Sequence, residues 1–379
     1  MFRYWMLALA TAAYVVCFAV WTLIGALAPL YRQALQLSAT QVGWLVAAPV
    51  LVGALARLPV GMLADRFGAH RVLSVLVAVL VVPVLMAGHT KSYAGLLVWG
   101  AFLGLGGAAF AAGVRFVSRW FPPGRYGIAL GVFGLGNLGA ALSASLAPAV
   151  SAMWGLRAVF VLYAIVLALT ALMFFRLGSA PINPRPMPGT GTLRALRAPG
   201  AWLLGFYFLV TFGGFLALSV HLATVLVDVY QLSPGRSGSH VAVFATAGTF
   251  ARPIGGYVAD RLGGTRVLYG VFPTVTMLAL VLAAEPGHFA GMTVIFALGV
   301  TLGAGNGAVT KLIAEWFPDN VGAVSGLAGG IGSLGGLLLP VAQGVGQDLI
   351  GSYVFGFLVL AALALIALIL STRSPPVRS

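Results

Sequence analysis

Long apolar segments dominate this chain and restrict it to folds that a lipid bilayer can solvate. Twelve segments are long enough to cross a membrane, because about 20 apolar residues in a helix span about 30 Å of hydrocarbon. They lie near residues 5–28, 41–63, 71–89, 94–118, 127–150, 155–177, 200–226, 237–260, 267–284, 288–314, 321–346 and 349–371. Only 7% of the residues are charged, against about 25% in a soluble domain. The sequence therefore predicts an all-α membrane protein with twelve transmembrane helices.

Two phrases in the first half of the chain recur in the second half. Residues 56–73 read ARLPVGMLADRFGAHRVL, and residues 251–268 read ARPIGGYVADRLGGTRVL, 195 positions later. The second pair is RFVSRWFPPG at 115–124 and KLIAEWFPDN at 311–320, with nearly the same offset. An internal repeat of this kind is typical of secondary transporters, whose substrate site lies near mid-membrane between two related halves.

A glycine-rich helix follows the second phrase in each half, GLGNLG at 134–139 and GGIGSLGG at 329–336. Small residues let membrane helices approach one another closely and slide. The repeat predicts two pseudo-symmetric six-helix bundles, residues 1–177 and 200–379. A linker rich in proline, glycine and threonine, residues 178–199, joins them.

The loop charges predict the orientation of the chain in the membrane. If the N-terminus is inside, most Lys and Arg residues lie in cytoplasmic loops and ends, as the positive-inside rule requires. Few face out: Arg32, Lys91, Arg157 and Arg236. We expect an integral protein of the cytoplasmic membrane with both termini and the linker in the cytoplasm. The first helix is too long for a signal-peptide core, so we interpret it as the first span.

The remaining composition argues against several function classes. The net charge is +14, but Lys and Arg occur singly at helix ends, which favours membrane lipid and not nucleic acid as a partner. The single cysteine, Cys17, allows no intrachain disulfide and no cysteine metal site. No metal cluster, phosphate loop or Ser/His/Asp arrangement occurs, so we predict no enzyme, cofactor or metal. A receptor would need a soluble output domain, and no polar segment of the chain is longer than the linker.

Arg57 and Arg252 are the most informative residues, because both lie deep inside predicted spans. Eight residues separate Arg57 from Asp65, about 12 Å along a helix. An arginine at that depth costs at least ~2.5 kcal/mol and cannot deprotonate. The acidic residues all lie near predicted helix ends: Asp65, Asp228, Asp260, Glu285, Glu315, Asp319 and Asp348. We infer that an anionic substrate supplies the counter-charge. The alternative is bonding to backbone carbonyls near Pro59 and Pro253.

Guanidinium chemistry narrows the class of anion. The group is planar, and its fork of donors matches planar oxyanions bidentately, so two forks from opposite halves could clamp a small planar oxyanion from both sides. A second matched pair of cations, Arg115 and Lys311, lies closer to the cytoplasmic end. These residues could line an inward vestibule and concentrate anions. They could equally extend to lipid phosphates, and Lys311 could pair with Glu315 one helical turn later.

The DR loops after spans 2 and 8 carry the charges expected of a gate. A carboxylate at a helix end can accept hydrogen bonds from a neighbouring helix N-terminus or from an arginine. The alternative is a simple topology signal. The gating candidates are Asp65, Arg66, Arg71, Asp260, Arg261 and Arg266.

The two DR loops resemble the G-x-x-x-D-R-x-G-x-R/K loop of the major facilitator superfamily. GLGGAAFAAGVRFVSRWFPPGRYGIALGVFGLGNLG (104–139) and LGAGNGAVTKLIAEWFP (302–318) resemble the two nitrate motifs of its nitrate/nitrite porter family. The resemblance covers essentially the whole chain. It implies a secondary active transporter that moves nitrate and/or nitrite by alternating access, with DR loops that latch one conformation.

The resemblance also implies roles for individual residues. Arg57 and Arg252 match the substrate ligands of spans 2 and 8, and Asn137 matches a hydrogen-bond donor to the substrate. Three aromatics match the rings that sandwich the flat faces of the anion: Phe18, Phe110 and Phe212. Some relatives place a tyrosine three residues before the TFG of span 7. Here Phe208 stands in that place, so either the hydroxyl contact is lost or the adjacent Tyr207 supplies it.

Two questions stay open in the sequence. The first is the substrate, since a carrier of another small anion, cyanate or a monocarboxylate, would use the same fold. The second is coupling. His221 and His240 lie near outer helix ends and no carboxylate is central, which favours anion exchange. The phrasing KLIAEWFP and RWFPPGRYGIALG is closer to the family branch thought to take up nitrate with protons, so proton symport and antiport both remain. We expect a monomer.

Overall fold

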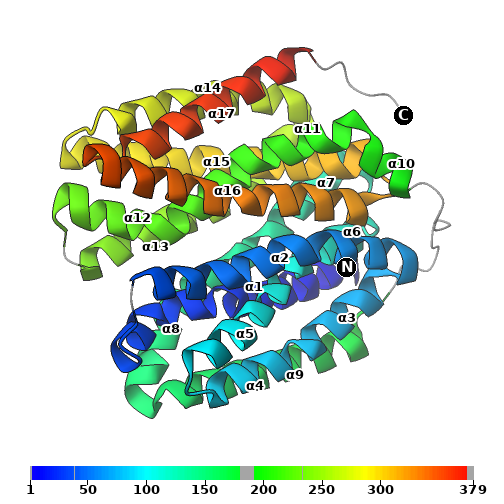
Figure 1. Ribbon diagram of the computed structural model, residues 1–379. Coiled ribbons are helices and arrows are strands. Elements are labelled where there is room, and N and C mark those ends of the chain that lie inside the picture. The colour runs from blue at the N-terminus through cyan, green and yellow to red at the C-terminus, as the bar shows by residue number, and fades with distance from the viewer. Residues whose placement is uncertain (1, 38, 180–191, 233, 374–379) are drawn as a thin grey trace. The chain divides into compact units, whose positions relative to one another are not determined.

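The computed structural model describes residues 2–37, 39–179, 192–232 and 234–373, and the regular secondary structure of these ranges is helical (Figure 1). The first half contains α1 (Phe2–Ala34), α2 (Ala39–Phe67), α3 (Ala69–Val79), α4 (Val81–His89), α5 (Tyr93–Leu103), η1 (Gly104–Ala108), α6 (Ala109–Ser118), η2 (Pro123–Arg125), α7 (Tyr126–Phe133), η3 (Gly134–Asn137), α8 (Leu138–Trp154) and α9 (Leu156–Leu177). The second half contains α10 (Thr192–Arg197), α11 (Pro199–Phe208), η4 (Leu209–Gly213), α12 (Gly214–Tyr230), α13 (Pro234–Leu262), α14 (Gly264–Ala283), α15 (His288–Trp316), α16 (Val321–Ile350) and α17 (Val354–Arg373).

Each predicted span corresponds to a helix or to a run of short helices. Eleven helical segments in the described ranges are long and apolar enough to cross a membrane. The remaining span, α13, is 29 residues long but carries more charged residues than the other spans: Arg236, Arg252, Asp260 and Arg261. The lower hydrophobicity of α13 therefore comes in part from Arg252 and from the DR phrase at the end of the helix.

Several spans are interrupted at positions that the sequence explains. The break between α3 and α4 falls at Leu80, three residues before Pro83. Proline donates no backbone hydrogen bond and its ring clashes with the carbonyl four residues earlier, so the helix breaks there. Span 4 tightens into the 3₁₀ helix η1, whose sequence is GLGGA. Span 7 contains a π-helical turn, η4, with the sequence LVTFG.

Packing divides the chain into two compact units. Unit 1 consists of Met1–Pro122, Leu135–Arg197 and Phe317–Gly330, and unit 2 consists of Pro123–Gly134, Ala198–Trp316 and Ile331–Ser379. These units differ from the predicted bundles, residues 1–177 and 200–379, by two half-spans. The first part of α16 packs with unit 1, and α7 packs with unit 2. The predicted boundary stays a prediction, since residues 180–191 of the linker lie outside the described ranges.

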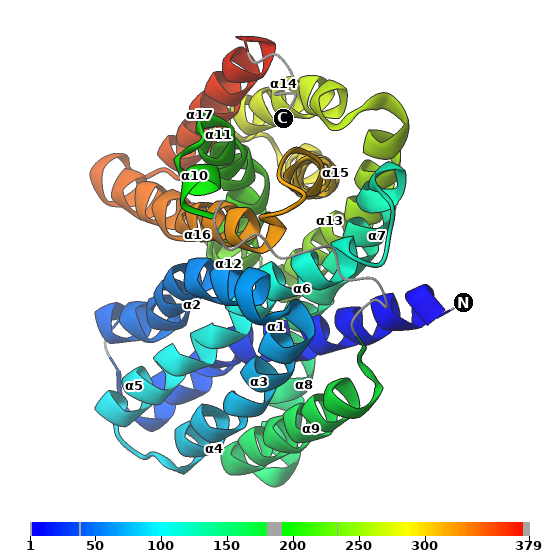
Figure 2. The same ribbon diagram turned by 90° about the vertical axis from the view of Figure 1, so that its right-hand side faces the viewer.

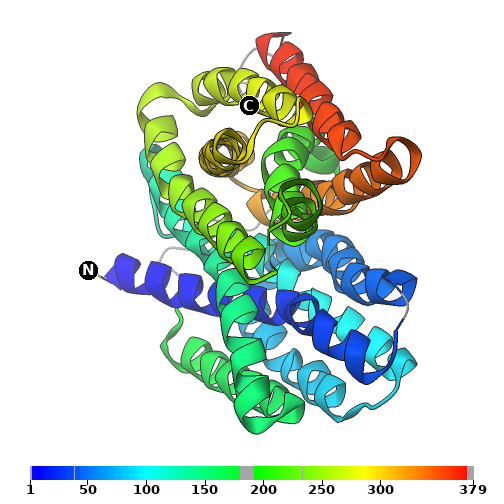
Figure 3. The ribbon, with the colours of Figure 1, turned by 90° about the vertical axis from the view of Figure 1, so that its left-hand side faces the viewer.

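Within each unit, long helices pack side by side. In unit 1, α1 packs along α8 and α4 along α9; Figure 3 shows α1 in dark blue crossing the green α8. In unit 2, α15 packs against α13 and α14, and α14 against α17. Figure 2 views α15 nearly end-on beside these neighbours.

The repeat in the sequence is also a repeat in the backbone. Gly68 and Gly263, 195 positions apart, follow the two DR phrases, and both have positive φ angles of 94° and 90°. L-residues rarely adopt this conformation, so glycine allows the turn from α2 into α3 and from α13 into α14. The two halves therefore use the same turn at the same place.

Candidate functional site

Arg57 lies in the middle of α2 and is completely buried. Its Nε donates to the carbonyl oxygen of Gly107 at 3.0 Å, and its Nη1 donates to that of Gly329 at 2.6 Å. Carbonyl bonding, which the sequence left as an alternative, is thus present for two of its nitrogens, but the carbonyls belong to η1 and α16 and not to a break beside Pro59. Carbonyl oxygens carry no net charge, so these bonds orient the guanidinium and do not neutralise it.

Aromatic rings surround the guanidinium of Arg57. Its Cζ lies 4.9 Å from the ring centroid of Trp21 and 5.6 Å from that of Phe110. The Phe18 ring packs edge-on against Trp21 at 5.1 Å and against Tyr14 at 5.7 Å. We call Tyr14, Phe18, Trp21 and Phe110 the aromatic cluster. Two predicted site residues, Phe18 and Phe110, therefore lie with Arg57 in unit 1.

Asn137 joins the aromatic cluster through a hydrogen bond. The hydroxyl of Tyr14 donates to Oδ1 of Asn137 at 3.1 Å. Asn137 is 3% exposed, and its Nδ2 has no acceptor among the described residues. A buried amide N–H without an acceptor is costly. This nitrogen can therefore donate to a ligand oxygen, as the predicted role of Asn137 requires.

Arg252 occupies the matching place in unit 2. It lies in α13, 195 positions after Arg57, and is 2% exposed. Its guanidinium passes directly over Gly134, where a β-carbon would come within 2.5 Å of Nε and 2.8 Å of Cζ. In unit 1, a β-carbon on Gly329 would lie 3.0 Å from Cδ of Arg57. Each arginine thus packs against a glycine at an equivalent position of the repeat.

Glycines bring the paired helices of each unit into backbone contact. A β-carbon on Gly326 would collide with the carbonyl of Arg57, and one on Gly131 would come within 2.9 Å of the carbonyl oxygen of Arg252. The positions 131 and 326 are again 195 apart. The glycine-rich helices are therefore needed for close approach to the arginine-bearing helices, which agrees with the role of small residues in membrane packing.

Asp65 and Asp260 each bind the N-terminus of a neighbouring helix. Asp65 accepts hydrogen bonds from the backbone N–H groups of Gly322 (3.1 Å) and Ala323 (2.7 Å), at the start of α16. Asp260 accepts bonds from Gly127 (2.8 Å) and Ile128 (2.9 Å), at the start of α7. The helix dipole and the exposed N–H groups favour a carboxylate at these points. The predicted contact between a DR-loop aspartate and a helix N-terminus is present in both units.

Arg115 and Lys311 are buried and ion-paired in this structure. Nε of Arg115 lies 3.0 Å from Oδ1 of Asp65, and its Nη1 donates to the carbonyl of Pro318 at 2.8 Å. Lys311 pairs with Glu315 at 2.5 Å, the i,i+4 alternative raised from the sequence. Both cations are held by carboxylates, so a vestibule role for them stays a prediction.

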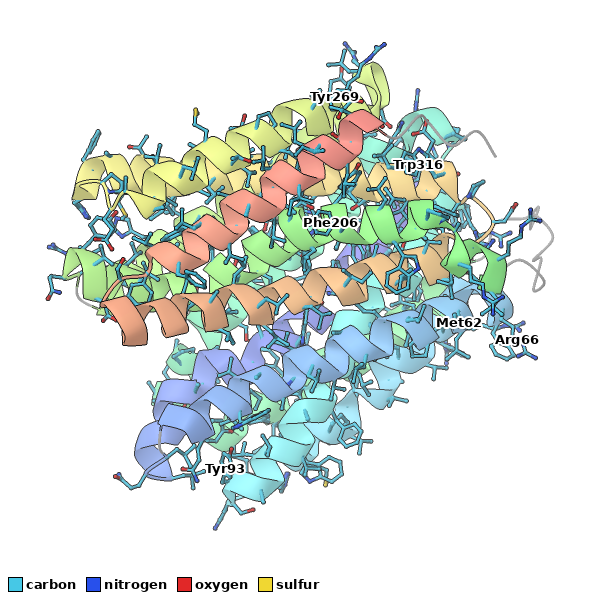
Figure 4. The ribbon with its side chains drawn as sticks, turned by 45° about the horizontal axis from the view of Figure 1, so that its top comes forward. Met62, Arg66, Tyr93, Phe206, Tyr269 and Trp316 are labelled. Carbon is cyan, nitrogen blue, oxygen red and sulfur yellow. The ribbon has the colours of Figure 1, made fainter. Side chains whose placement is uncertain are left out.

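The four arginines of the DR loops are exposed, unlike the neighbouring aspartates. Figure 4 shows Arg66 at one end of α2, with Tyr93 at the opposite end of unit 1. The Arg66 guanidinium lies 5.2 Å from the Phe67 ring, and that of Arg261 lies 4.6 Å from the Tyr257 ring. Arg71 and Arg266 begin the following helices. The helix-capping contacts come from the aspartates, and a gating role for the arginines stays a prediction.

The aromatic candidates of span 7 point to different neighbours. Phe208 packs on Phe212 at 5.2 Å, beside the π-helical turn η4. Tyr207 packs on Phe272 of α14 at 5.1 Å. π-Helical turns often occur at functional sites. Phe208 therefore lies with the predicted site residue Phe212, and Tyr207 lies against α14.

Sequence reasoning missed Tyr14, Trp21 and the glycines that contact the arginines. Tyr14 and Trp21 lie in an apolar helix, where an aromatic residue is ordinarily read as packing. Gly134 and Gly329 could have been found, because they stand 195 positions apart in the two glycine-rich phrases. The repeat offset was the available signal.

The two capping aspartates differ in their burial, which gives a stability prediction. Asp65→Asn removes the carboxylate partner of the buried Arg115, and breaking a buried pair costs about 3–5 kcal/mol. Asp260 is half-buried, and its hydrogen bonds come from neutral N–H groups, so Asp260→Asn loses about 1.5–3 kcal/mol. We expect a larger fall in melting temperature in detergent for Asp65→Asn. Equal falls would contradict this difference.

Known proteins similar to this chain now identify its family. The family model described as Major Facilitator Superfamily matches residues 9–290 and 241–379. The chain is 36% identical over 376 residues to the probable nitrate/nitrite transporter NarK2 of Mycobacterium tuberculosis, covering 95% of this chain and 94% of that protein. It is 33% identical to the probable nitrate/nitrite antiporter NarK1 of Thermus thermophilus, covering 95% and 88%. The chain belongs to the nitrate/nitrite porter family of the major facilitator superfamily. A nitrite extrusion protein of Bacillus subtilis is 31% identical, covering 96% of this chain and 92% of that protein.

Solved structures of the superfamily share the fold of this porter-family chain. The outward conformation of the transporter FucP matches with a TM-score of 0.77 and 16% identity, covering 97% of this chain and 98% of FucP. The human organic anion transporter MFSD10 matches with a TM-score of 0.80 and 14% identity, covering 97% and 99%. The fold is therefore twelve transmembrane helices in two six-helix bundles, as the sequence predicted. Membership of a transporter family also confirms that the protein is not an enzyme.

Proposed function

We propose that this protein carries nitrate and/or nitrite across the cytoplasmic membrane by alternating access, with Arg57 and Arg252 as ligands of the anion. One observation carries the proposal: each half of the repeat buries an arginine at the same position of a membrane-spanning helix. A permanently charged group at this depth is costly and marks a site that handles charge. The similarity to relatives named as nitrate/nitrite transporters supports nitrate and nitrite as the anion.

The surroundings of Arg57 support a small, planar ligand. Carbonyl bonds to Nε and Nη1 fix the plane of the guanidinium, and this planar fork suits a bidentate oxyanion. The buried Nδ2 of Asn137 adds a neutral donor. The ring of Phe110, 5.6 Å from Cζ of Arg57, and that of Phe18, which packs on Trp21 and Tyr14, are the candidate apolar walls. These groups favour an ion that is flat and accepts several hydrogen bonds, which describes nitrate and nitrite.

The cellular setting completes the proposal. The positive-inside charge distribution supports cytoplasmic termini and a place in the cytoplasmic membrane. Membrane lipid surrounds the chain, and a monomer is the proposed unit. Protons are the candidate co-substrate if transport is symport, and a second anion replaces them if it is exchange.

Counterflow in proteoliposomes tests substrate and coupling together. Labelled nitrate is supplied outside, with nitrite inside in one set of vesicles and an inward proton gradient in another. Acceleration by internal nitrite is expected for exchange, and accumulation driven by the proton gradient is expected for symport.

Protein-free vesicles control for leakage in this assay. Cyanate and a monocarboxylate are added as competitors. If neither nitrate nor nitrite moves faster than in protein-free vesicles, while cyanate or the monocarboxylate does, the nitrate proposal is wrong and the carrier of another small anion replaces it.

A further inference from the structure

We propose that Trp21 is a positioning residue that holds the guanidinium of Arg57 in place for the anion. The inference rests on the proposed role of Arg57 as a substrate ligand. Trp21 lies in α1 and is 3% exposed, and its ring centroid is 4.9 Å from Cζ of Arg57. This distance is shorter than the 5.6 Å between Cζ of Arg57 and the ring centroid of Phe110.

The indole is itself locked in place. Its Nε1 donates to the carbonyl oxygen of Pro49 in α2 at 3.0 Å. Two glycines open the space for the ring: a β-carbon on Gly107 would lie 3.0 Å from Cδ2, and one on Gly53 would lie 3.0 Å from Nε1 of Trp21. Gly107 is also the residue whose carbonyl accepts from Nε of Arg57. The Trp21 ring therefore holds one face of the Arg57 guanidinium, and the carbonyl of Gly107, which lies against that ring, holds one edge.

An aromatic face suits this task for an electrostatic reason. The negative face of the ring attracts the cation, and tryptophan does so most strongly of the aromatic residues. The ring carries no net charge and does not titrate. A carboxylate in its place would neutralise the arginine and compete with an anionic substrate. Trp21 can therefore stabilise the buried guanidinium of Arg57 without neutralising the positive charge that would attract an anion.

The second half of the repeat has a phenylalanine, and not a tryptophan, at the corresponding place. Gly53 and Gly248 are 195 positions apart, and a β-carbon on Gly248 would collide with the ring of Phe215. Phe215 thus occupies the place of Trp21, but it stacks on Phe244 at 5.6 Å and 20°. Phenylalanine has no N–H, so it cannot make the indole hydrogen bond. The tryptophan is a feature of the first half alone, and repeat symmetry does not require it.

Nitrate transport kinetics in proteoliposomes test the proposal with three variants. Trp21→Leu removes the aromatic face, and we expect KM for nitrate to rise about tenfold with kcat within about twofold, because binding is weakened uniformly. Trp21→Phe keeps a face but loses the hydrogen bond, so KM rises about two- to threefold. Phe215→Leu removes a comparably buried ring and leaves KM within about twofold of the wild-type value.

Three results would overturn the proposal: an unchanged KM in Trp21→Leu, an equal KM in the two Trp21 variants, or a matching rise in Phe215→Leu. If Trp21→Leu does not elute as a monodisperse protein, Trp21→Phe decides alone, and an unchanged KM there counts against the proposal. Arg57→Lys separates this failure from that of the proposed function. Wild-type transport by Arg57→Lys refutes the proposed role of Arg57 as a ligand of the anion, whereas an inactive Arg57→Lys with unaffected Trp21 variants refutes only the positioning role of Trp21.

Discussion

Replacing Arg57 or Arg252 by lysine is expected to abolish nitrate transport while the protein still folds. Lysine keeps the positive charge but presents a compact ammonium in place of the planar fork, so it cannot make the paired bonds to a flat oxyanion. It also cannot reproduce the two carbonyl bonds of Arg57 to Gly107 and Gly329 in the same plane. We expect the rate of nitrate exchange in proteoliposomes to fall by about 100-fold or more.

Arg176→Lys is the matched control for these variants. Arg176 is an exposed arginine in the last turn of α9, so its replacement should leave transport unchanged. Size-exclusion profiles and melting temperatures establish that each variant is folded. Transport at the wild-type rate by either Arg57→Lys or Arg252→Lys would remove that residue from the proposed site.

A single added methyl group at Gly134 is expected to be nearly as damaging as loss of the arginine. The β-carbon of Gly134→Ala would lie 2.5 Å from Nε and 2.8 Å from Cζ of Arg252, so the guanidinium must move. The flexible side chain can move without unfolding the protein, but a displacement of about 1 Å in a positioned group costs about 100-fold in rate. Gly329→Ala meets Arg57 only at 3.0 and 3.1 Å, so we expect a smaller loss.

The measurement is kcat/KM for nitrate with Gly270→Ala as the control. Gly270 lies in α14, and no atom stands within 4 Å of the place its β-carbon would take. The expected order of activity is Gly270→Ala, then Gly329→Ala, then Gly134→Ala. An active Gly134→Ala would show that the position of the Arg252 guanidinium does not limit transport.

These predictions depend on features that differ in how far the sequence alone could establish them. The membrane class, the spans and the repeat follow from hydrophobic length and from an offset of 195 positions. The burial of Arg57 and Arg252 followed as well, because their distance from Asp65 and Asp260 along a helix sets their depth. For these aspartates the sequence left a helix N-terminus or an arginine as the partner. The structure shows a helix N-terminus for both, with Arg115 in addition for Asp65.

The partners of the buried groups were decided only by tertiary structure. Arg57 bonds to carbonyls 50 and 272 positions away, and no pattern within α2 indicates which helices supply them. Arg115 could extend to lipid or line a vestibule on sequence grounds, but packing places it beside Asp65. Trp21 reads as an ordinary apolar residue until α2 lies across α1. Helical periodicity determines which residues share a face, whereas the neighbour of that face depends on how distant segments pack.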